Sequence, residues 1–146
     1  MAENNVNIQM RLVSVNEVSF MMAPAIITDD VKPESIQLGF SNQVRPDIEH
    51  DRIAVVFGIR YELNGDRALE CVYRFEFEVK ELAQFVKIHD DNHVTITHIM
   101  PHLLSVAVGT MRGILVAKTA GTNLSKFPLP MIDPNRLMMF LSGSQK

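Results

Sequence analysis

The sequence predicts one α+β domain, in which four strands precede one long helix. Three observations support this fold class. Apolar and polar residues alternate along the first half of the chain, Asn64-Gly65 separates two of the alternating segments, and a nearly continuous apolar segment follows Pro101. Alternation is typical of half-buried strands, Asn-Gly of a tight hairpin, and a long apolar segment of a buried helix. A chain of 146 residues, 47% of them hydrophobic, is long enough to bury its own core.

The first strand is expected in the alternating segment that begins at Val6 and ends at Met22. The alternation slips after Leu12 and is restored from Val18 onward. One extra residue in a strand produces such a slip, so we predict a β-bulge or a bend near Ser14 to Asn16.

Three more strands are expected before the long helix. Alternation predicts a short second strand over residues 36–41, followed by a loop that contains Pro46. The segments 53–63 and 69–79 carry apolar residues at odd positions, and Asn64-Gly65 joins them as a hairpin. Their even positions carry mixed charge, so we expect the other face of this sheet to be solvated.

The long helix is expected between Pro101 and Lys118, because proline suits the first helical position and Gly121 suits a stop. Almost every side of it is apolar, and one sheet covers only one side of a helix. Small residues recur along it at four-residue spacing, which aligns them on one face and allows another backbone to approach closely. They are Ser105, Gly109, Gly113 and Ala117. Such a row most often packs on the chain's own sheet, but the all-round apolar character favours a helix of a second subunit.

Two shorter helical segments are also expected. One covers Glu81–Val86, ahead of a polar turn at Asp90–Asn92. The other begins near the C-terminus at Asp133-Pro134, where aspartate suits the N-cap and proline suits the first helical residue.

Charge and composition argue against several classes of partner. The net charge is -3 and no run of lysine and arginine is present, which disfavours nucleic acids and anionic membranes. The apolar stretch Leu103–Ala117 is interrupted by Arg112 and is shorter than the roughly 20 residues that a bilayer requires, so we expect no membrane insertion. The polar N-terminus shows no secretory signal and Cys71 has no cysteine to pair with, so we expect a cytoplasmic protein with an inert, buried thiol.

One cluster of residues is a candidate for metal binding. It contains His89, Asp90, Asp91, His93, His98 and His102. His98 and His102 would share a metal only if both were helical, and Pro101 disfavours helical geometry for the residue before it. We therefore expect ordinary loop histidines here, and no catalytic residue, metal or cofactor.

Several segments resemble SecB, the bacterial export chaperone, in the same order along nearly the whole chain. They are IQMRLVSVNEVSFMMAP, VKPESIQLGF, the strand pair around Cys71, the helix after IMP, and the proline-rich KFPLPMI. The resemblance implies a four-stranded antiparallel sheet with helices on one face, assembled as a dimer of dimers with the long helices between the sheets. It also implies an ATP-independent holdase that binds non-native polypeptides in apolar grooves.

The resemblance also places candidate residues for these contacts. Six residues are expected to bind client peptides: Phe20, Met21, Met22, Ile36, Leu38 and Phe40. The row on the long helix is the candidate oligomer interface. The nine methionines suit either an irregular core or an adaptable groove, because methionine repacks easily.

Two differences from SecB concern its delivery of clients to the SecA motor. Val72 stands where SecB has an acidic residue, and the sequence ends at LSGSQK without the family's long acidic tail. SecA therefore stays a possible partner only. The alternative function is that of a dedicated chaperone or adaptor for one partner, such as a toxin-antitoxin pair.

Overall fold

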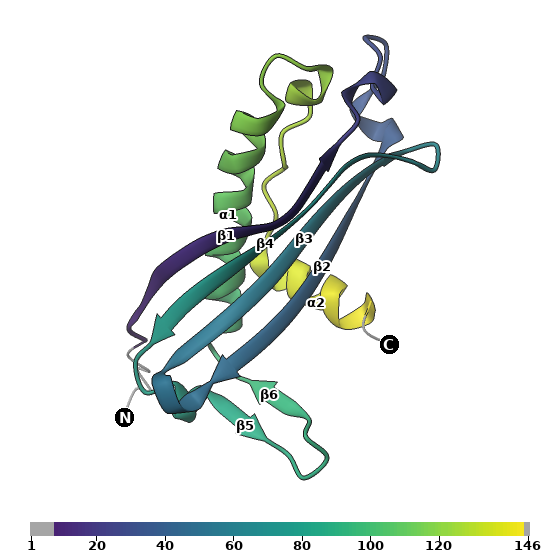
Figure 1. Cartoon of the computed structure of the whole chain (residues 1–146). Helices are drawn as coiled ribbons and strands as arrows, with labels where there is room; N and C mark the ends of the chain where they lie inside the picture. The colour runs from purple at the N-terminus through teal and green to yellow at the C-terminus, as the bar shows by residue number, and fades with distance from the viewer. Residues whose placement is uncertain (1–7, 145–146) are drawn as a thin grey trace, which may run out of the picture.

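A computed structural model describes residues 8–144, and the side chains as far as Met139. It contains a four-stranded antiparallel sheet with helices on one face (Figure 1). The strand order is β1-β4-β3-β2, so β1 and β2 form the two edges. The strands are β1 (Met10–Met22), β2 (Ile36–Asp47), β3 (Arg52–Leu63) and β4 (Asp66–Val79). The predicted α+β fold is confirmed, while Val6, where the alternation begins, lies outside the described residues.

The inner face of the sheet, which packs on the helices, is apolar because every second residue of β3 and β4 is apolar and buried. Phe57 and Phe75 on this face have no exposed surface. The outer face carries charges of both signs, from arginines and glutamates, some of them in ion pairs such as that between Arg11 and Glu78. The sheet is therefore amphipathic, as the sequence predicted.

Strand β1 carries two irregularities where one was predicted. Its pairing with β4 shifts between Leu12 and Ser14, and again between Glu17 and Ser19. The first shift lies close to the predicted bulge, and the second, at Val18, was not predicted. Two extra residues within one edge strand increase its local twist.

Strand β2 is twice as long as predicted, and the predicted loop at Pro46 is wrong. Pro46 lies in the strand, opposite Ile53 of β3. An edge strand tolerates proline because one side of its backbone makes no ladder hydrogen bonds. The hairpin at Asn64-Gly65 is confirmed, since both residues have positive φ angles, 52° and 85°, as a tight β-hairpin turn requires.

Helix α1 (Met100–Thr119) is the main helix and lies behind the sheet in Figure 1. By length and composition alone it is long and apolar enough to cross a membrane, unlike the shorter stretch counted in the sequence. However, one side of it packs into the core, with Leu103, Leu104 and Met111 at 1% exposure or less. Helix α2 (Pro134–Ser144) follows, and the Asp133 carboxylate accepts a 3.0 Å hydrogen bond from the backbone N–H of Asn135, as expected of an N-cap.

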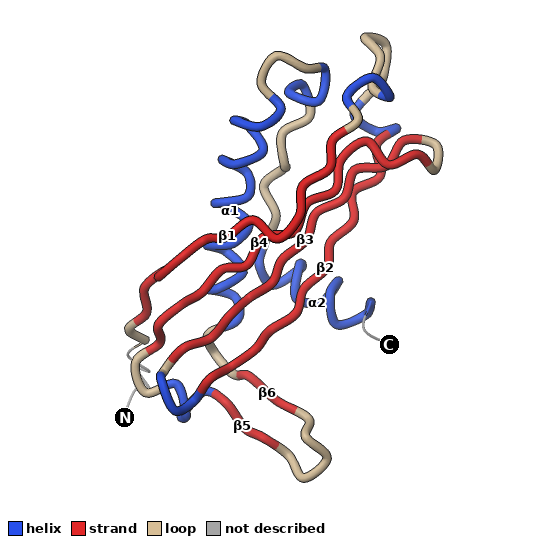
Figure 2. The backbone as a smooth tube through the Cα atoms, in the orientation of Figure 1, coloured by secondary structure: helices blue, strands red, loops and turns tan. Residues whose placement is uncertain are grey.

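A small hairpin, which the sequence pattern did not predict, follows the main sheet. Strands β5 (Val86–Ile88) and β6 (Val94–Ile96) form a separate two-stranded sheet that projects from one end of the main sheet (Figure 2). The predicted polar turn joins them. Within the described residues, five 3-10 helices connect the larger elements: η1 (Pro24–Ile26), η2 (Pro33–Ser35), η3 (Ile48–His50), η4 (Leu82–Phe85) and η5 (Asn123–Lys126).

Candidate functional site

An apolar pocket of about 270 Å³ lies where the start of β2 meets the proline-rich segment after α1. Its lining comes from η2, β2, β3 and residues 126–130. The lining residues are Pro33, Ile36, Leu38, Tyr61, Lys126, Phe127, Pro128 and Pro130. Lys126 is the one charged member, and its Nζ lies 3.7 Å from the Asp29 carboxylate.

The proline-rich wall of this pocket is held by side chains from two other elements. The hydroxyl of Tyr61 on β3 donates a 2.9 Å hydrogen bond to the carbonyl of Phe127. Arg112 on α1 donates through Nε to the carbonyl of Leu129 at 2.9 Å and through Nη2 to that of Pro130 at 2.8 Å. Proline has a fixed φ and no N–H, so these donors and the rings together fix the wall.

Tyr61 remains a hydrogen-bond donor over the whole physiological range. Burial, with a smaller contribution from nearby Cys71, raises the pKa of Tyr61 to about 12. Its ring lines the pocket, and its hydroxyl is occupied by the Phe127 carbonyl. The pocket surface therefore presents hydrocarbon and aromatic atoms, with little unsatisfied polarity.

The structure places two of the three β2 candidates at this pocket. Ile36 and Leu38 line it directly. Phe40 lies two residues further along the same face, half-buried, with its ring 5.9 Å from that of Phe57. Two of the three candidates that the resemblance placed on β2 therefore line the pocket, and the third lies beyond it.

The three β1 candidates lie at the opposite edge of the sheet, so the six predicted residues do not form one groove. Three inter-strand spacings separate the two edges, or roughly 14 Å. Phe20 packs under Lys118, whose Nζ is 5.0 Å from the ring centroid, and Met22 is half-buried beside it on the inner face. Met21 belongs to the outer face and is 40% exposed.

The pocket also differs from the expected groove of methionine and phenylalanine. None of its described lining residues is methionine. Met131, which follows Pro130 directly, is 87% exposed, and Met139 on α2 is 75% exposed. The lining residues that the sequence did not single out are Pro33, Tyr61, Lys126, Phe127, Pro128 and Pro130. The segment KFPLPMI was the available signal for four of them.

The small residues of α1 form an exposed row on the described chain. Ser105, Gly109, Gly113 and Ala117 all face away from the core. A Cβ atom built on either glycine would meet no atom within 4 Å. A second cavity, of about 310 Å³, begins at this row and is lined by Ile8, Met10, His102, Ser105 and Val106.

Comparisons with known proteins relate this geometry to a solved structure. No family model matches the chain, and no curated protein matches it in sequence. The chain is similar in structure to the Mycobacterium tuberculosis Rv1957 SecB-like chaperone, solved in complex with a ChAD peptide from the Rv1956 HigA1 antitoxin. The TM-score is 0.54 at 12% identity, over 84% of this chain and 89% of that chain. The fold is SecB-like.

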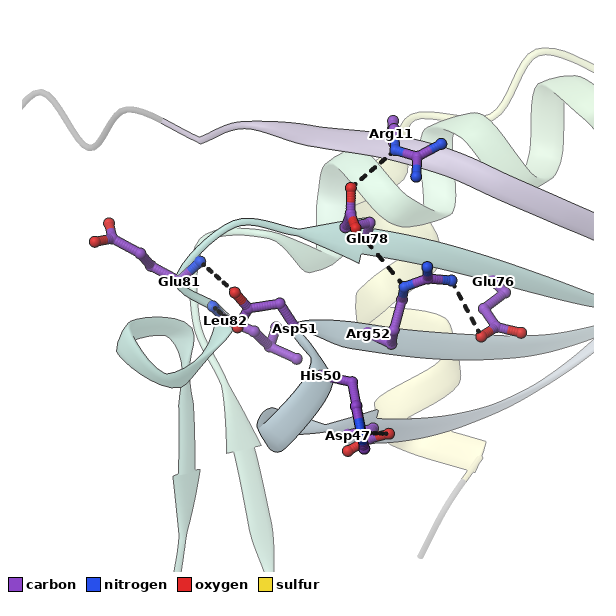
Figure 3. A network of polar contacts seen from close by, with 9 residues as sticks. All are labelled: Arg11, Asp47, His50, Asp51, Arg52, Glu76, Glu78, Glu81 and Leu82. Atoms are coloured by element: carbon purple, nitrogen blue, oxygen red, sulfur yellow. Dashed lines mark hydrogen bonds and ion pairs between the residues drawn. The ribbon is translucent and has the colours of Figure 1, made fainter.

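Charged side chains on the outer face of this SecB-like fold form ion pairs between neighbouring strands. Figure 3 shows Glu78 between two arginines, with its carboxylate 2.8 Å from Arg11 and 3.9 Å from Arg52. Arg11 donates a hydrogen bond to this carboxylate and holds the pKa of Glu78 below its usual value. The pairs are exposed to solvent and link β1, β4 and β3 across the outer face.

Asp51, also drawn in Figure 3, joins the turn between β2 and β3 to the segment that follows β4. The backbone of Asp51 is in the left-handed region, with φ of 53°. The Asp51 carboxylate accepts hydrogen bonds from the backbone N–H groups of Glu81 and Leu82 at 3.2 and 3.1 Å. Asp51 therefore caps the start of η4.

The candidate metal cluster is not assembled within the described residues. His98 has a positive φ before α1 begins, with its ring 6.5 Å from that of Phe85, whereas His102 lies within α1. His89 bonds to Thr95 at 2.8 Å. The described residues whose ligand atoms do lie within 4.8 Å of one another are Asp47, Glu49 and His50, and all three are exposed.

Proposed function

We propose that this chain is a divergent SecB-like chaperone that binds segments of non-native polypeptide without catalysis or ATP. The observation that carries the proposal is the apolar pocket between β2 and the proline-rich segment. The fold similarity to a chaperone solved with a bound peptide supports it.

The size of the pocket favours a side chain over a small molecule as its occupant. Small-molecule pockets usually measure roughly 300–1,000 Å³ and place several polar groups around the ligand. This pocket is smaller, at about 270 Å³, and its polar groups are Lys126 at one side and the engaged hydroxyl of Tyr61. A single large apolar side chain of an extended segment fits this description, because burying it releases roughly 1.5–3 kcal/mol.

We further propose that several copies of the chain act together, through the row on α1. Glycine within a helix destabilises it by about 1 kcal/mol relative to alanine. Nothing within the described chain occupies the space beside Gly109 and Gly113, so their small size has no internal function. Close approach of α1 from a second copy would explain their small size. The resulting assembly would be a dimer or a dimer of dimers. Multiple pockets on one assembly would then hold a long client through many weak contacts.

A dedicated role with one partner is the second candidate. Three prolines line the pocket and stiffen it, which favours a narrower range of sequences than methionine would accept. We propose a cytoplasmic location and a single domain for either role, and SecA handover for neither. Recovery of one dominant species when the tagged protein is isolated from its own cells would favour the dedicated role.

The function is tested by measuring suppression of aggregation of a chemically denatured enzyme at stoichiometric amounts of this protein. The key variant is Leu38→Gln, which places an amide in the pocket. The matched control is Val18→Gln, because Val18 is 60% exposed on β1 and lies outside the pocket. We expect wild type and the control to suppress aggregation and Leu38→Gln to lose most of the effect. Equal suppression by all three proteins would exclude this pocket, and no suppression by wild type would exclude the holdase.

A further inference from the structure

We propose that Arg112 is the positioning residue that holds the proline-rich wall, residues 127–132, at the distance from β2 that keeps the pocket formed. The inference rests on the proposed function, since it concerns how the same pocket is kept ready for a client. Arg112 does not itself line the pocket, so its effect is exerted through the segment that it holds.

The wall has few hydrogen bonds of its own. Within the described chain, the backbone of residues 128–132 makes no hydrogen bond to other backbone groups, and Pro128 and Pro130 have no N–H to donate. The carbonyls of Phe127, Leu129 and Pro130 instead accept from side chains. Two of these three acceptors are served by Arg112 alone.

The side chain of Leu129 retains the wall, but does not orient it. Leu129 is 2% exposed and is therefore anchored in the core. Pro128 and Pro130 flank it and both line the pocket. Phe127 and Ile132, near the two ends of the wall, are only partly buried against the core, and Tyr61 holds the Phe127 carbonyl. Between these points the two Arg112 hydrogen bonds fix the carbonyl directions of Leu129 and Pro130.

The two hydrogen bonds require the guanidinium fork specifically. Nε and Nη2 of Arg112 reach two neighbouring carbonyls at 2.9 and 2.8 Å. An ammonium group is a single point charge on a flexible stem and does not reproduce two parallel, planar donors. Arg112→Lys keeps the charge and most of the aliphatic stem, so it tests the fork without removing the packing.

The test uses two readouts on full-length protein. The first is hydrogen exchange, without any client, of a peptide fragment that covers residues 124–133, in which the backbone N–H groups of Ser125 and Phe127 are hydrogen-bonded next to the wall. The second is the affinity for a fluorescent, extended apolar peptide with one central tryptophan, measured by anisotropy well below the melting temperature of each variant. Arg112→Lys and Arg112→Gln are compared with Arg45→Gln, a control at an exposed arginine at the far end of β2.

We expect both Arg112 variants to exchange faster in the fragment and to bind the peptide about tenfold more weakly, because preorganisation of the wall is lost. The double variant Arg112→Gln, Leu38→Gln should lose less affinity than the sum of the single losses, since both act through one pocket. Unchanged exchange and unchanged affinity in both Arg112 variants would overturn the proposal. If wild type fails to bind the peptide, the proposed function fails, and the exchange data alone still decide whether Arg112 holds the wall.

Discussion

The hydroxyl of Tyr73 on β4 donates a 2.7 Å hydrogen bond to the carboxylate of Glu17 on β1, on the inner face of the sheet. The same carboxylate lies 3.3 Å from Nζ of Lys118, near the end of α1. Glu17 thus ties an edge strand to both its neighbouring strand and the main helix. The hydrogen bond from Tyr73, together with Lys118, holds the pKa of Glu17 below its ordinary value of 4.5.

Tyr73→Phe should lower the thermal midpoint by about 2–4 °C, the shift expected for one lost hydrogen bond in a chain of this size. A lowered pKa in the folded state means that this stabilisation is present above pH 4.5 and is lost as the pH falls further. The difference between the variant and wild type should therefore shrink in melts recorded at about pH 3. A difference that is the same at pH 3 and pH 7 would mean that the Tyr73 hydroxyl acts independently of the Glu17 charge.

Asp51→Ala should destabilise the protein by about 2 kcal/mol in urea unfolding, since it removes the cap of η4 and leaves alanine in a left-handed backbone. Asp51→Asn is the matched control, because asparagine tolerates this conformation and keeps one acceptor oxygen. We expect Asn to cost less than half as much as Ala. Equal losses for the two variants would show that the charge, and not the backbone geometry, is what matters at this corner.

High pH should destabilise the protein through buried acidic groups. Burial raises the pKa of the Cys71 thiol from 9.0 to about 12, and that of Tyr61 from 10.0 to about 12. These two groups ionise at lower pH in the unfolded chain than in the folded protein. Their contribution to the free energy of unfolding is therefore fully present below pH 9 and is lost as the pH rises towards 12. Urea midpoints between pH 8 and 11 measure the loss, and Cys71→Ala should flatten the profile. Rapid reaction of native Cys71 with a thiol reagent at pH 8 would contradict the burial on which this prediction depends.

Replacing both glycines of the α1 row by alanine should separate the two effects of their small size. Within one chain, Gly109→Ala with Gly113→Ala meets no atom and should stabilise the helix by about 1 kcal/mol for each change. Between copies, the added methyl groups should weaken association. Light scattering against concentration measures the assembly, and Thr110→Ala on another side of α1 is the control. An assembly as stable as that of wild type would show that the row is not the interface.

Local signals in the sequence were sufficient for most of the fold. Asn64-Gly65 forms its turn because both residues tolerate positive φ angles. Asp133-Pro134 begins α2 because the aspartate caps the first turn of that same helix. Pro46 misled because the sequence alone does not say which strand lies at an edge, where proline is tolerated. The inward position of Glu17 was missed for a related reason, since a second shift in pairing, at Val18, brings it opposite Tyr73.

Only one of the two walls of the candidate site, the one on β2, could be predicted from the sequence. Ile36 and Leu38 were singled out through the resemblance to SecB, and both line the pocket. Their partners Phe127 and Pro128 lie about ninety residues later, in a segment without periodicity, so only tertiary packing brings the two walls together. Phe20 and Ile36 looked alike in sequence, yet strand order places them at opposite edges.

The stiff wall of prolines also has a consequence for the heat of the proposed peptide binding. Because the proline rings are ordered before a client segment binds, this protein loses little conformational entropy on binding. Most of the entropy loss falls on the client segment. Calorimetry at several temperatures should then give a negative heat-capacity change from the buried apolar area, with a favourable enthalpy near 25 °C, as is common for preformed apolar sites.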